Sequence, residues 1–224
     1  PPFHNSFRIS KPLLDGNETP FISSWLDDFV EVKPNYLFQN HGKAFTGDFT
    51  YSNGFVLDFE EADVLVKRNE KNKDCLWLFI NGRDLNDSPH QKASRMVICF
   101  EDWALEKAKD YPDLLDIVIR RVKPERDNIK SKKERENWWL FGRYRKELRK
   151  ATNSMNYLLV RSMVSEHHMI SIIPKSQVLS MALVVFALDD YYSFSLLQSN
   201  IHEIWLRRQA STLESRNRYT HSDC

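Results

Sequence analysis

The stretch TLESRNRYT, residues 212–220, carries charged and hydrogen-bonding side chains at alternating positions. Because alternate residues of an extended strand share a face, Glu214, Arg216 and Arg218 would lie together. The other face would carry Ser215, Asn217 and Tyr219. An arginine offers a planar fork of donors that fits the two major-groove acceptors of guanine, and a glutamate accepts from the amino group of cytosine. The spacing therefore predicts a strand that can hydrogen-bond to base edges.

Two interpretations of this strand stay open on the residues alone. Neither face is apolar, so we expect a strand outside the core. If the strand meets a nucleic acid, each bidentate contact would contribute about 1–3 kcal/mol of base discrimination. If it is an ordinary surface strand, its charges would pair with one another for about 0–1 kcal/mol.

Positive charge is concentrated in one block of the chain. Residues 120–150 hold 13 Lys/Arg against 5 Asp/Glu, a net of +8, whereas residues 1–119 hold 13 against 20, a net of −7. Such a block is typical of a polyanion footprint or of a solvated helix face. As a footprint, its phosphate contacts would come from Lys130, Lys132, Lys133, Arg135, Arg143 and Arg145. The alternative function is a non-enzymatic interaction domain whose 120–150 block docks on an acidic protein surface.

Motifs for catalysis or metal binding are missing. The stretch GKAFTGD lacks the Gly-Lys-Ser/Thr ending of a phosphate loop, and no Gly-x-Gly-x-x-Gly occurs. Glu166, His167 and His168 are consecutive, whereas a metal-binding helix spaces two histidines three or four apart, so we expect a structural or phosphate-contacting histidine. Asp189 and Asp190 precede a predicted helix, where an aspartate more often caps. We expect no catalytic residue and no metal site, and a hydrolase built on these residues is the least supported hypothesis.

Composition limits the class of protein. The 224 residues are 42% hydrophobic and 12% aromatic, enough to bury a sizeable core in one large or two small domains. The longest apolar run, residues 181–188, is far too short to span a membrane. Three cysteines are too few for a disulfide framework, and no signal peptide opens the sequence, so we expect a cytoplasmic protein. Because no methionine begins the sequence, we expect an excerpt of a longer chain.

Apolar spacing and capping residues predict several helices. Asp58 is the expected N-cap of a helix over 58–68, and Pro112 suits the first turn of a helix over 112–122. Residues 137–151 fit an amphipathic helix whose basic side chains lie opposite its aromatic ones. Further helices are expected over 23–31, 101–111 and 191–211.

Apolar runs rich in β-branched and aromatic residues predict the strands. Strands or strands with turns are expected over 35–57, 75–80, 95–100, 156–164, 168–174 and 181–187. We therefore predict an α+β fold, with mixed strands packed with several helices. No linker divides the sequence, so we expect one domain over 1–224. Within it we distinguish an N-terminal connecting region (1–34), an acidic α/β half (35–115) and a basic half (116–224).

Six short motifs follow one another along the sequence. They are NGRDLN at 81–86, VKPER at 122–126, NWWLFGRYRKELRKA at 137–151, SEHHMISIIP at 165–174, FSLLQSNIHEIWL at 194–206 and LESRNRYTHSDC at 213–224. Each is weak alone, but their common order is rather specific. In this order the chain, over roughly 35–224, resembles the target-recognition domain of MmeI-like (type IIG/IIL) fused restriction–modification enzymes and DNA adenine methyltransferases.

The resemblance implies a function. Full-length members look like a methyltransferase domain followed by a DNA-reading domain, often with an N-terminal nuclease. The methyltransferase uses S-adenosylmethionine to methylate an adenine amine, and a fused nuclease would use Mg²⁺. Neither the cofactor glycine motif nor the Asn-Pro-Pro-aromatic motif occurs here. The chain would be the reader without the catalytic domain, and its expected partners are double-stranded DNA and an N-terminal methyltransferase domain of the same polypeptide.

The resemblance also assigns roles to the first stretch discussed above. In the family the segment similar to LESRNRY, which includes Ser215, carries the base-reading side chains. Glu214 and Arg216 match a pair of positions that together specify one base pair, and Arg218 matches a further specificity position. Ala182 matches another if no gap intervenes. Because these positions vary within the family, their identities do not name the recognised sequence.

Overall fold

The computed structural model describes residues 11–23, 26–30, 37–213 and 216–221. Two compact units are present, residues 1–37 and residues 38–224. In the first, β1 (Leu13–Leu14) pairs antiparallel with β2 (Asn17–Glu18). Asp15 and Gly16, at φ +49° and +83°, both take the left-handed conformation in the two-residue connecting turn. The helix expected over 23–31 is wrong for residues 26–29, which form a bend.

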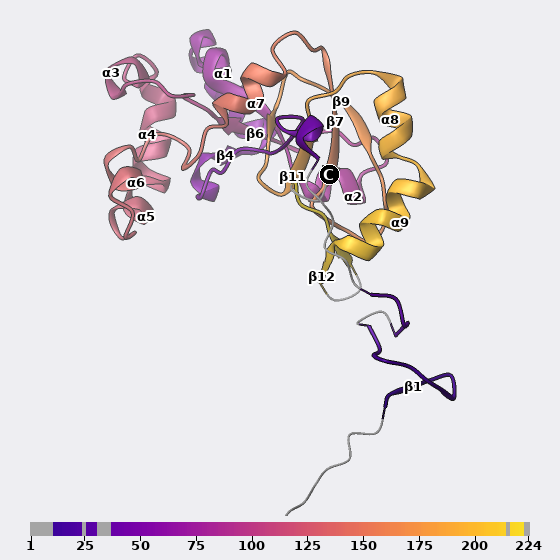
Figure 1. Ribbon diagram of the computed structural model, residues 1–224. Coiled ribbons are helices and arrows are strands. Elements are labelled where there is room, and N and C mark those ends of the chain that lie inside the picture. The colour runs from indigo at the N-terminus through magenta and orange to yellow at the C-terminus, as the bar shows by residue number, and fades with distance from the viewer. Residues whose placement is uncertain (1–10, 24–25, 31–36, 214–215, 222–224) are drawn as a thin grey trace, which may run out of the picture. The chain divides into compact units, whose positions relative to one another are not determined.

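The first sheet of the second unit lies next to helices α1 (Phe59–Arg68) and α4 (Pro112–Arg121), as its strands β4 and β6 show in Figure 1. Its strand order is β10–β5–β6–β4, and β10 pairs parallel with β5 while the other pairs are antiparallel. The strands are β4 (Val56–Leu57), β5 (Leu76–Ile80), β6 (Arg95–Ile98) and β10 (Val178–Leu179). The two helices each bury one apolar face in the core formed with this sheet, through Ala62 and Leu65 of α1 and Leu114, Leu115, Ile117 and Val118 of α4.

Local signals explain both helices. Asp58 caps α1 by accepting a hydrogen bond of 2.7 Å from the backbone N–H of Glu61, and Pro112 occupies the first turn of α4. Both predictions are confirmed, as are the strands expected over 75–80 and 95–100. The expected helix over 101–111 is only one turn long, α3 (Leu105–Ala108).

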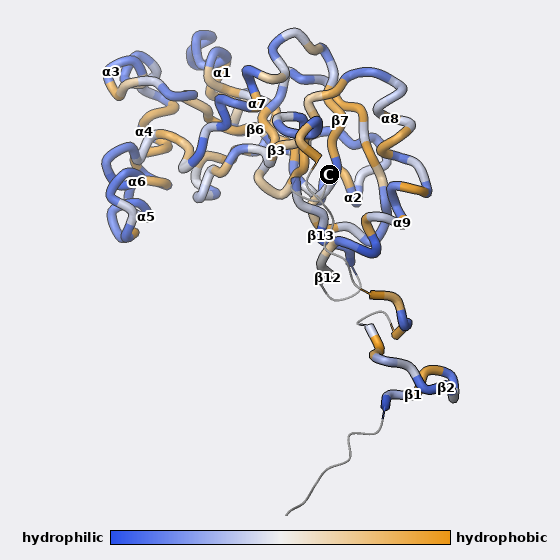
Figure 2. Tube along the Cα trace, in the orientation of Figure 1, coloured by the Kyte–Doolittle hydropathy of each residue, from blue (hydrophilic) through white to orange (hydrophobic). Residues whose placement is uncertain are grey.

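The second sheet is the central layer around which the C-terminal part of the chain folds. Its antiparallel order is β3–β11–β7–β9. The strands are β3 (Ala44–Thr46), β7 (Tyr157–Ser162), β9 (Ser171–Pro174) and β11 (Leu183–Phe186). Every residue of β11 is buried, because Leu183 and Val185 face one core cluster while Val184 and Phe186 face another. Figure 2 shows β7 as an apolar stretch in this layer.

Helices cover both faces of this second sheet. On one face, α2 (Gly82–Asp87) and α7 (Lys146–Ala151) contribute Leu85 and Leu148. On the other, α8 (Tyr191–Leu197) and α9 (Asn200–Gln209) contribute Leu197 and Leu206. The predicted α+β class is confirmed. The remaining short helices are η1 (Phe38–Asn40), η2 (Asn53–Phe55), η3 (Glu70–Cys75), α5 (Lys123–Asp127) and α6 (Lys132–Glu136).

The prediction of one amphipathic helix over 137–151 is wrong, since only Lys146–Ala151 is helical. Tertiary packing overrides the local spacing. Trp139 is buried and its indole N–H donates to the carbonyl of Trp103 at 2.9 Å, while Phe141 packs edge-on against Phe55. At Gly142 an added Cβ would lie 2.0 Å from the ring of Tyr51, so only a residue without a side chain fits where the chain passes this ring.

The helix expected over 191–211 is divided in two. Asp190 caps α8 through the backbone N–H of Ser193 at 2.7 Å, and Ser199 caps α9 through that of His202 at 3.2 Å. The serine side chain restarts the helix, which lets α9 change direction and lead into the C-terminal strands (Figure 1). Within the described part of the chain, no helix is long and apolar enough to cross a membrane.

Candidate nucleic-acid interface

The C-terminal residues form a hairpin, not the single extended strand predicted over 212–220. Strand β12 (Ser211–Leu213) pairs antiparallel with β13 (Arg216–Arg218), in the register Ser211↔Arg218 and Leu213↔Arg216. The antiparallel pairing of β12 with β13 shows that the chain reverses direction between Leu213 and Arg216, and Glu214 and Ser215 lie outside the described residues. On its other side, β13 pairs with β8 (Val164–Ser165).

The two faces of β13 differ sharply. Arg216 and Arg218 are exposed on one face. On the other, Asn217 is 6% exposed and Tyr219 is fully buried. The expectation that neither face belongs to the core is therefore wrong for the second face. The tyrosine ring packs in the cluster formed with α8 and α9, so the buried face fixes the direction in which the two arginines point.

Ala182 lies beside this hairpin although 34 residues separate it from Arg216 in the sequence. It is exposed in the turn that precedes β11. The link is Met163, whose N–H donates to the carbonyl of Ala182 at 2.8 Å and whose carbonyl accepts from the N–H of Tyr219 at 2.8 Å. The fold thus brings three of the predicted base-reading residues close together at the surface: Ala182 in the turn before β11, and Arg216 and Arg218 on β13. We call this surface the reading edge.

Helix α2 lies next to the reading edge. Its N-cap Asn81 and Asp84 form a reciprocal capping box, which holds this short helix at its first turn. The amide of Asn86 donates to the hydroxyl of Ser162 at 3.3 Å and to the carbonyl of Val164 at 3.1 Å. These bonds attach α2 to the segment that pairs with β13.

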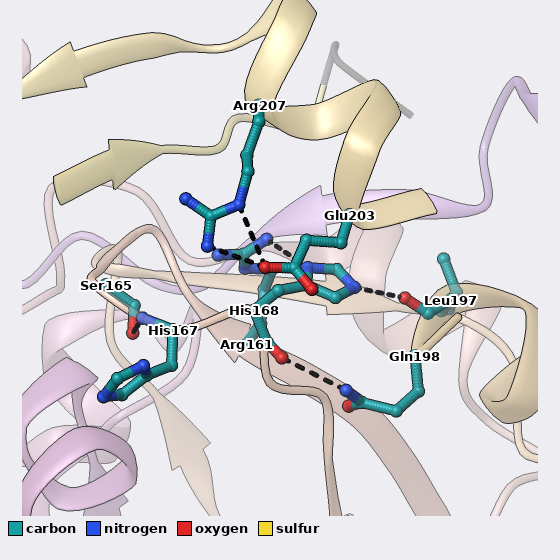
Figure 3. Close-up of polar contacts among 8 residues, drawn as sticks. All are labelled: Arg161, Ser165, His167, His168, Leu197, Gln198, Glu203 and Arg207. Atoms are coloured by element: carbon teal, nitrogen blue, oxygen red, sulfur yellow. Dashed lines mark hydrogen bonds and ion pairs between the residues drawn. The ribbon is translucent and has the colours of Figure 1, made fainter. Parts of the chain in front are cut away.

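A buried polar cluster contacts the residue that follows β13, and Figure 3 shows two of its members, Arg161 and His168. Arg161 of β7 is 1% exposed, and its guanidinium carbon lies 4.5 Å from the centroid of the Tyr219 ring. Its Nε donates to the carbonyl of Ser162 at 3.2 Å, and one terminal nitrogen lies 3.3 Å from Nδ1 of His168. Nε2 of His168 donates to the carbonyl of Leu197 at 2.6 Å, and this tautomer leaves Nδ1 as the acceptor.

His202 of α9 completes the cluster. Its ring stacks on His168 with 5.3 Å between centroids, and its Nε2 lies 3.1 Å from the hydroxyl of Tyr219. Burial lowers the pKa of His202 to about 4, with smaller contributions from His168 and Arg161. Burial also lowers the pKa of His168, opposed by its hydrogen bond to Leu197. Both imidazoles are therefore neutral near pH 7, which avoids two further positive charges beside the buried guanidinium.

This arrangement makes His168 a structural residue. The exposed His167 points away from it, as Figure 3 shows. Asp190 serves as a helix cap, as expected for an aspartate between a strand and a helix. Among the described residues, no group of three or more His, Cys, Asp or Glu side chains could hold a metal ion.

The predicted phosphate-contacting residues lie in a different place from the reading edge. Lys130, Lys132 and Lys133 are exposed around α6. Figure 1 shows α5 and α6 far from β12 within this unit. Lys133, Arg143 and Arg145 line one cavity of about 390 Å³, so the fold brings α6 and the segment before α7 together. We call this group the basic patch, although four acidic residues also line the cavity: Glu101, Asp102, Glu134 and Glu147.

Internal hydrogen bonds occupy two of the six predicted phosphate ligands, and a third, Lys132, forms an ion pair with Glu136. One terminal nitrogen of Arg135 donates to the carbonyls of Ile129 at 2.6 Å and Lys130 at 3.0 Å. Arg145 donates to the hydroxyl of Thr46, and its guanidinium carbon lies 5.0 Å from the centroid of the Phe49 ring. Arg143 is exposed, 5.4 Å from that same centroid.

Ion pairs neutralise much of the remaining 120–150 block. The pairs are Arg120–Asp116, Arg121–Glu61, Lys123–Asp127, Arg126–Glu134, Lys132–Glu136, Lys146–Asp102 and Arg149–Asp48. Several partners belong to the acidic half of the same chain. The net of +8 therefore overstates the charge available to any partner of this block, whether a polyanion or an acidic protein surface.

Comparison with known proteins identifies the family. The family model of the target recognition domain of MmeI matches residues 28–223. The chain belongs to the MmeI target recognition domain family. A solved structure described as the type IIL restriction–modification enzyme MmeI in complex with DNA has the same fold, with a TM-score of 0.73 at 18% identity. The match covers 92% of this chain and 27% of that one. A search of curated proteins found no match.

For this member of the MmeI target recognition domain family, sequence reasoning missed the supporting residues. Arg161 lies in an otherwise apolar strand, LLVRS, where a buried arginine signals a specific partner. That signal was available, but its partners Tyr219 and His168 were not visible from spacing. The two hydrogen bonds of Met163 use backbone atoms only, and no side-chain pattern could have indicated them.

Proposed function

We propose that the chain is the sequence-specific, double-stranded DNA recognition module of an S-adenosylmethionine-dependent DNA adenine methyltransferase of the restriction–modification type. The observation that carries the proposal is the reading edge, where two exposed arginines share one face of β13 next to Ala182. Membership of the MmeI target recognition domain family supports it, as does the DNA-bound state of the structurally similar enzyme.

The hairpin has dimensions suited to base recognition. The major groove of B-DNA admits β-strands, and β12 and β13 belong with β8 to a three-stranded sheet whose β13 carries both arginines on its exposed face. A side chain such as Arg216 or Arg218 can donate two hydrogen bonds to O6 and N7 of guanine, each such pair contributing about 1–3 kcal/mol of discrimination. A glutamate at 214 would accept from a cytosine amino group or orient Arg216.

Base reading also needs a hairpin that holds its direction. The buried contacts of Tyr219 with Arg161 and His202 lie directly beneath β13. A contact misplaced by about 1 Å loses its hydrogen bonds, so support of this kind is what a reading strand requires. The cluster has this role in our proposal.

Phosphate contacts would come from the basic patch and its neighbours. Such contacts fix the register of a protein on DNA, while base contacts specify the sequence. Lys130, Lys132, Lys133 and Arg143 are the exposed members of the predicted set. If these four neutralise four phosphates, the logarithm of the binding constant should fall with the logarithm of salt concentration with a slope of about −4. Arg135 and Arg145 would add to it only by giving up their internal bonds.

The catalytic activity would belong to another part of a longer protein. The chain spans only about a quarter of the MmeI chain that it matches. In our proposal a preceding methyltransferase domain of the same polypeptide binds S-adenosylmethionine and methylates the adenine. A fused type II endonuclease would use Mg²⁺. The 224 residues contribute the choice of sequence.

The proposal is tested by selecting bound duplexes from a random-sequence pool at two salt concentrations. We expect an enriched short motif and a salt slope near −4. An Arg216→Ala, Arg218→Ala double variant with an unchanged melting temperature should keep most of the salt slope and lose the motif. Steep salt dependence with no enriched motif for the unmodified chain would refute sequence reading by this module.

A further inference from the structure

Two of the smallest side chains in the protein face one another at the reading edge. A Cβ added to Gly82 would lie 3.9 Å from the Cβ of Ala182 and 2.7 Å from the hydroxyl of Ser162. The tight approach of α2 is therefore to Ser162, and Ala182 lies beside Gly82 at an ordinary van der Waals distance. Gly82 has no positive φ, so its backbone conformation does not require a glycine. What its missing side chain permits is the close approach to its neighbours.

The residue after Gly82 is an exposed arginine. The side chain of Arg83 is 86% exposed, and its Nε lies 3.9 Å from the nearer carboxylate oxygen of Asp87. That distance is too long for a hydrogen bond, and an exposed pair one helical turn apart holds an arginine only weakly. The backbone beneath the side chain is nevertheless fixed, because Asn81 and Asp84 cap this turn and Asn86 bonds to Ser162 and Val164.

Ala182 cannot form a side-chain hydrogen bond. A methyl group can contact the methyl of thymine but cannot donate to or accept from a base edge. Its small size also leaves space above the turn. An arginine carries its planar fork of donors several ångströms from its backbone. Arg83 directly follows Gly82, which is the residue of α2 that lies beside Ala182.

We propose that Arg83 is a further specificity-determining residue, which reaches over Ala182 to donate hydrogen bonds to the base pair that faces this turn. The inference rests on the proposed function, since it adds a residue to the same reading surface. It assigns α2 a direct part in recognition and makes base preference at this position depend jointly on residues 83 and 182.

The test compares the motifs selected from random duplexes by the unmodified chain, Arg83→Ala and Arg83→Lys. Arg83→Ala should lose discrimination at one base pair by about 5- to 150-fold and keep the other positions. Arg83→Lys should restore only part of it, because lysine lacks the bidentate fork. Ala182→Asn should change the preference at the same base pair as Arg83→Ala.

The matched control is Arg68→Ala, which also removes an exposed arginine with one carboxylate partner, Asp113 at 3.2 Å, but on α1. It should leave the motif unchanged, and melting temperatures verify that every variant folds. A motif unchanged in Arg83→Ala overturns the inference while the proposed function stands. So does weakening that is uniform over all sequences with a salt slope reduced by about one, which marks a phosphate contact. An unmodified chain that selects no motif overturns both.

Discussion

Acidification should destabilise the C-terminal half of the fold, because buried imidazoles must take up protons beside a buried guanidinium. His202 faces His168, Arg161 and the hydroxyl of Tyr219. Its pKa falls from an unfolded value of 6.5 to about 4 in the folded protein. The unfolded chain therefore binds more protons than the folded chain between these values, so stability is lost as the pH falls through this window.

The size of the effect follows from the shift. One pKa unit corresponds to about 1.4 kcal/mol, so the change from 6.5 to about 4 corresponds to at most about 3 kcal/mol, and to less where solvent screens the partly exposed ring. His168 acts in the same direction, since burial also lowers its pKa. The lowered carboxylate pKa values of Asp102, Asp190 and Glu203 add a further loss, but at lower pH.

Denaturant unfolding at intervals between pH 8 and pH 4 measures this dependence. A His202→Gln variant provides the comparison, because glutamine does not titrate and can still hydrogen-bond to Tyr219. The difference in unfolding free energy between the two proteins should shift by about 2–3 kcal/mol across the window, in favour of the variant at low pH. Parallel pH profiles for the two proteins would refute the reasoning about this cluster.

Three further changes probe other parts of the fold. Asp48→Ala should lower the free energy of unfolding by about 3 kcal/mol, because it leaves Arg149 without the buried carboxylate that its guanidinium contacts at 2.7 Å and 2.9 Å. A loss below about 1 kcal/mol in a denaturant titration would contradict this. Gly47→Ala should lower the melting temperature, since its Cβ would lie 2.3 Å from the backbone carbonyl oxygens of residues 179 and 180; an unchanged melting curve would show that the strands separate easily. Arg143→Ala should reduce the salt slope of DNA binding by about one without changing the selected motif, and a changed motif would place this residue on a base.

Local signals were enough to predict the elements that depend on local chemistry. Asp58 and Pro112 marked the starts of α1 and α4 because caps and first turns are satisfied within a few residues. The strands β5, β7 and β11 were visible as short apolar runs.

The elements that sequence analysis missed depend on distant partners. Trp139 and Phe141 leave helical spacing because their partners, Trp103 and Phe55, are far away in the sequence. Tyr219 looked like a surface residue because its hydroxyl contacts His202 only after α9 has folded back onto the second sheet. No local pattern carries that information.

The residues of the site were easier to propose than its geometry. The family resemblance pointed to Arg216, Arg218 and Ala182, which the fold places at one edge. The charge count also pointed to Arg135 and Arg145, whose internal hydrogen bonds appear only in three dimensions. A count of basic residues cannot distinguish a phosphate ligand from a side chain that the protein uses to hold itself together.

The most direct test of base reading at the hairpin is motif selection with a Glu214→Lys, Arg216→Asp double variant. These changes exchange the donor and acceptor character of the two positions, while residues beneath the hairpin stay unchanged. Our account predicts a different preferred base pair at one position of the motif, or loss of preference there, with an unchanged melting temperature. A correctly folded variant that selects the same motif as the unmodified chain would contradict the assignment of these residues to base recognition.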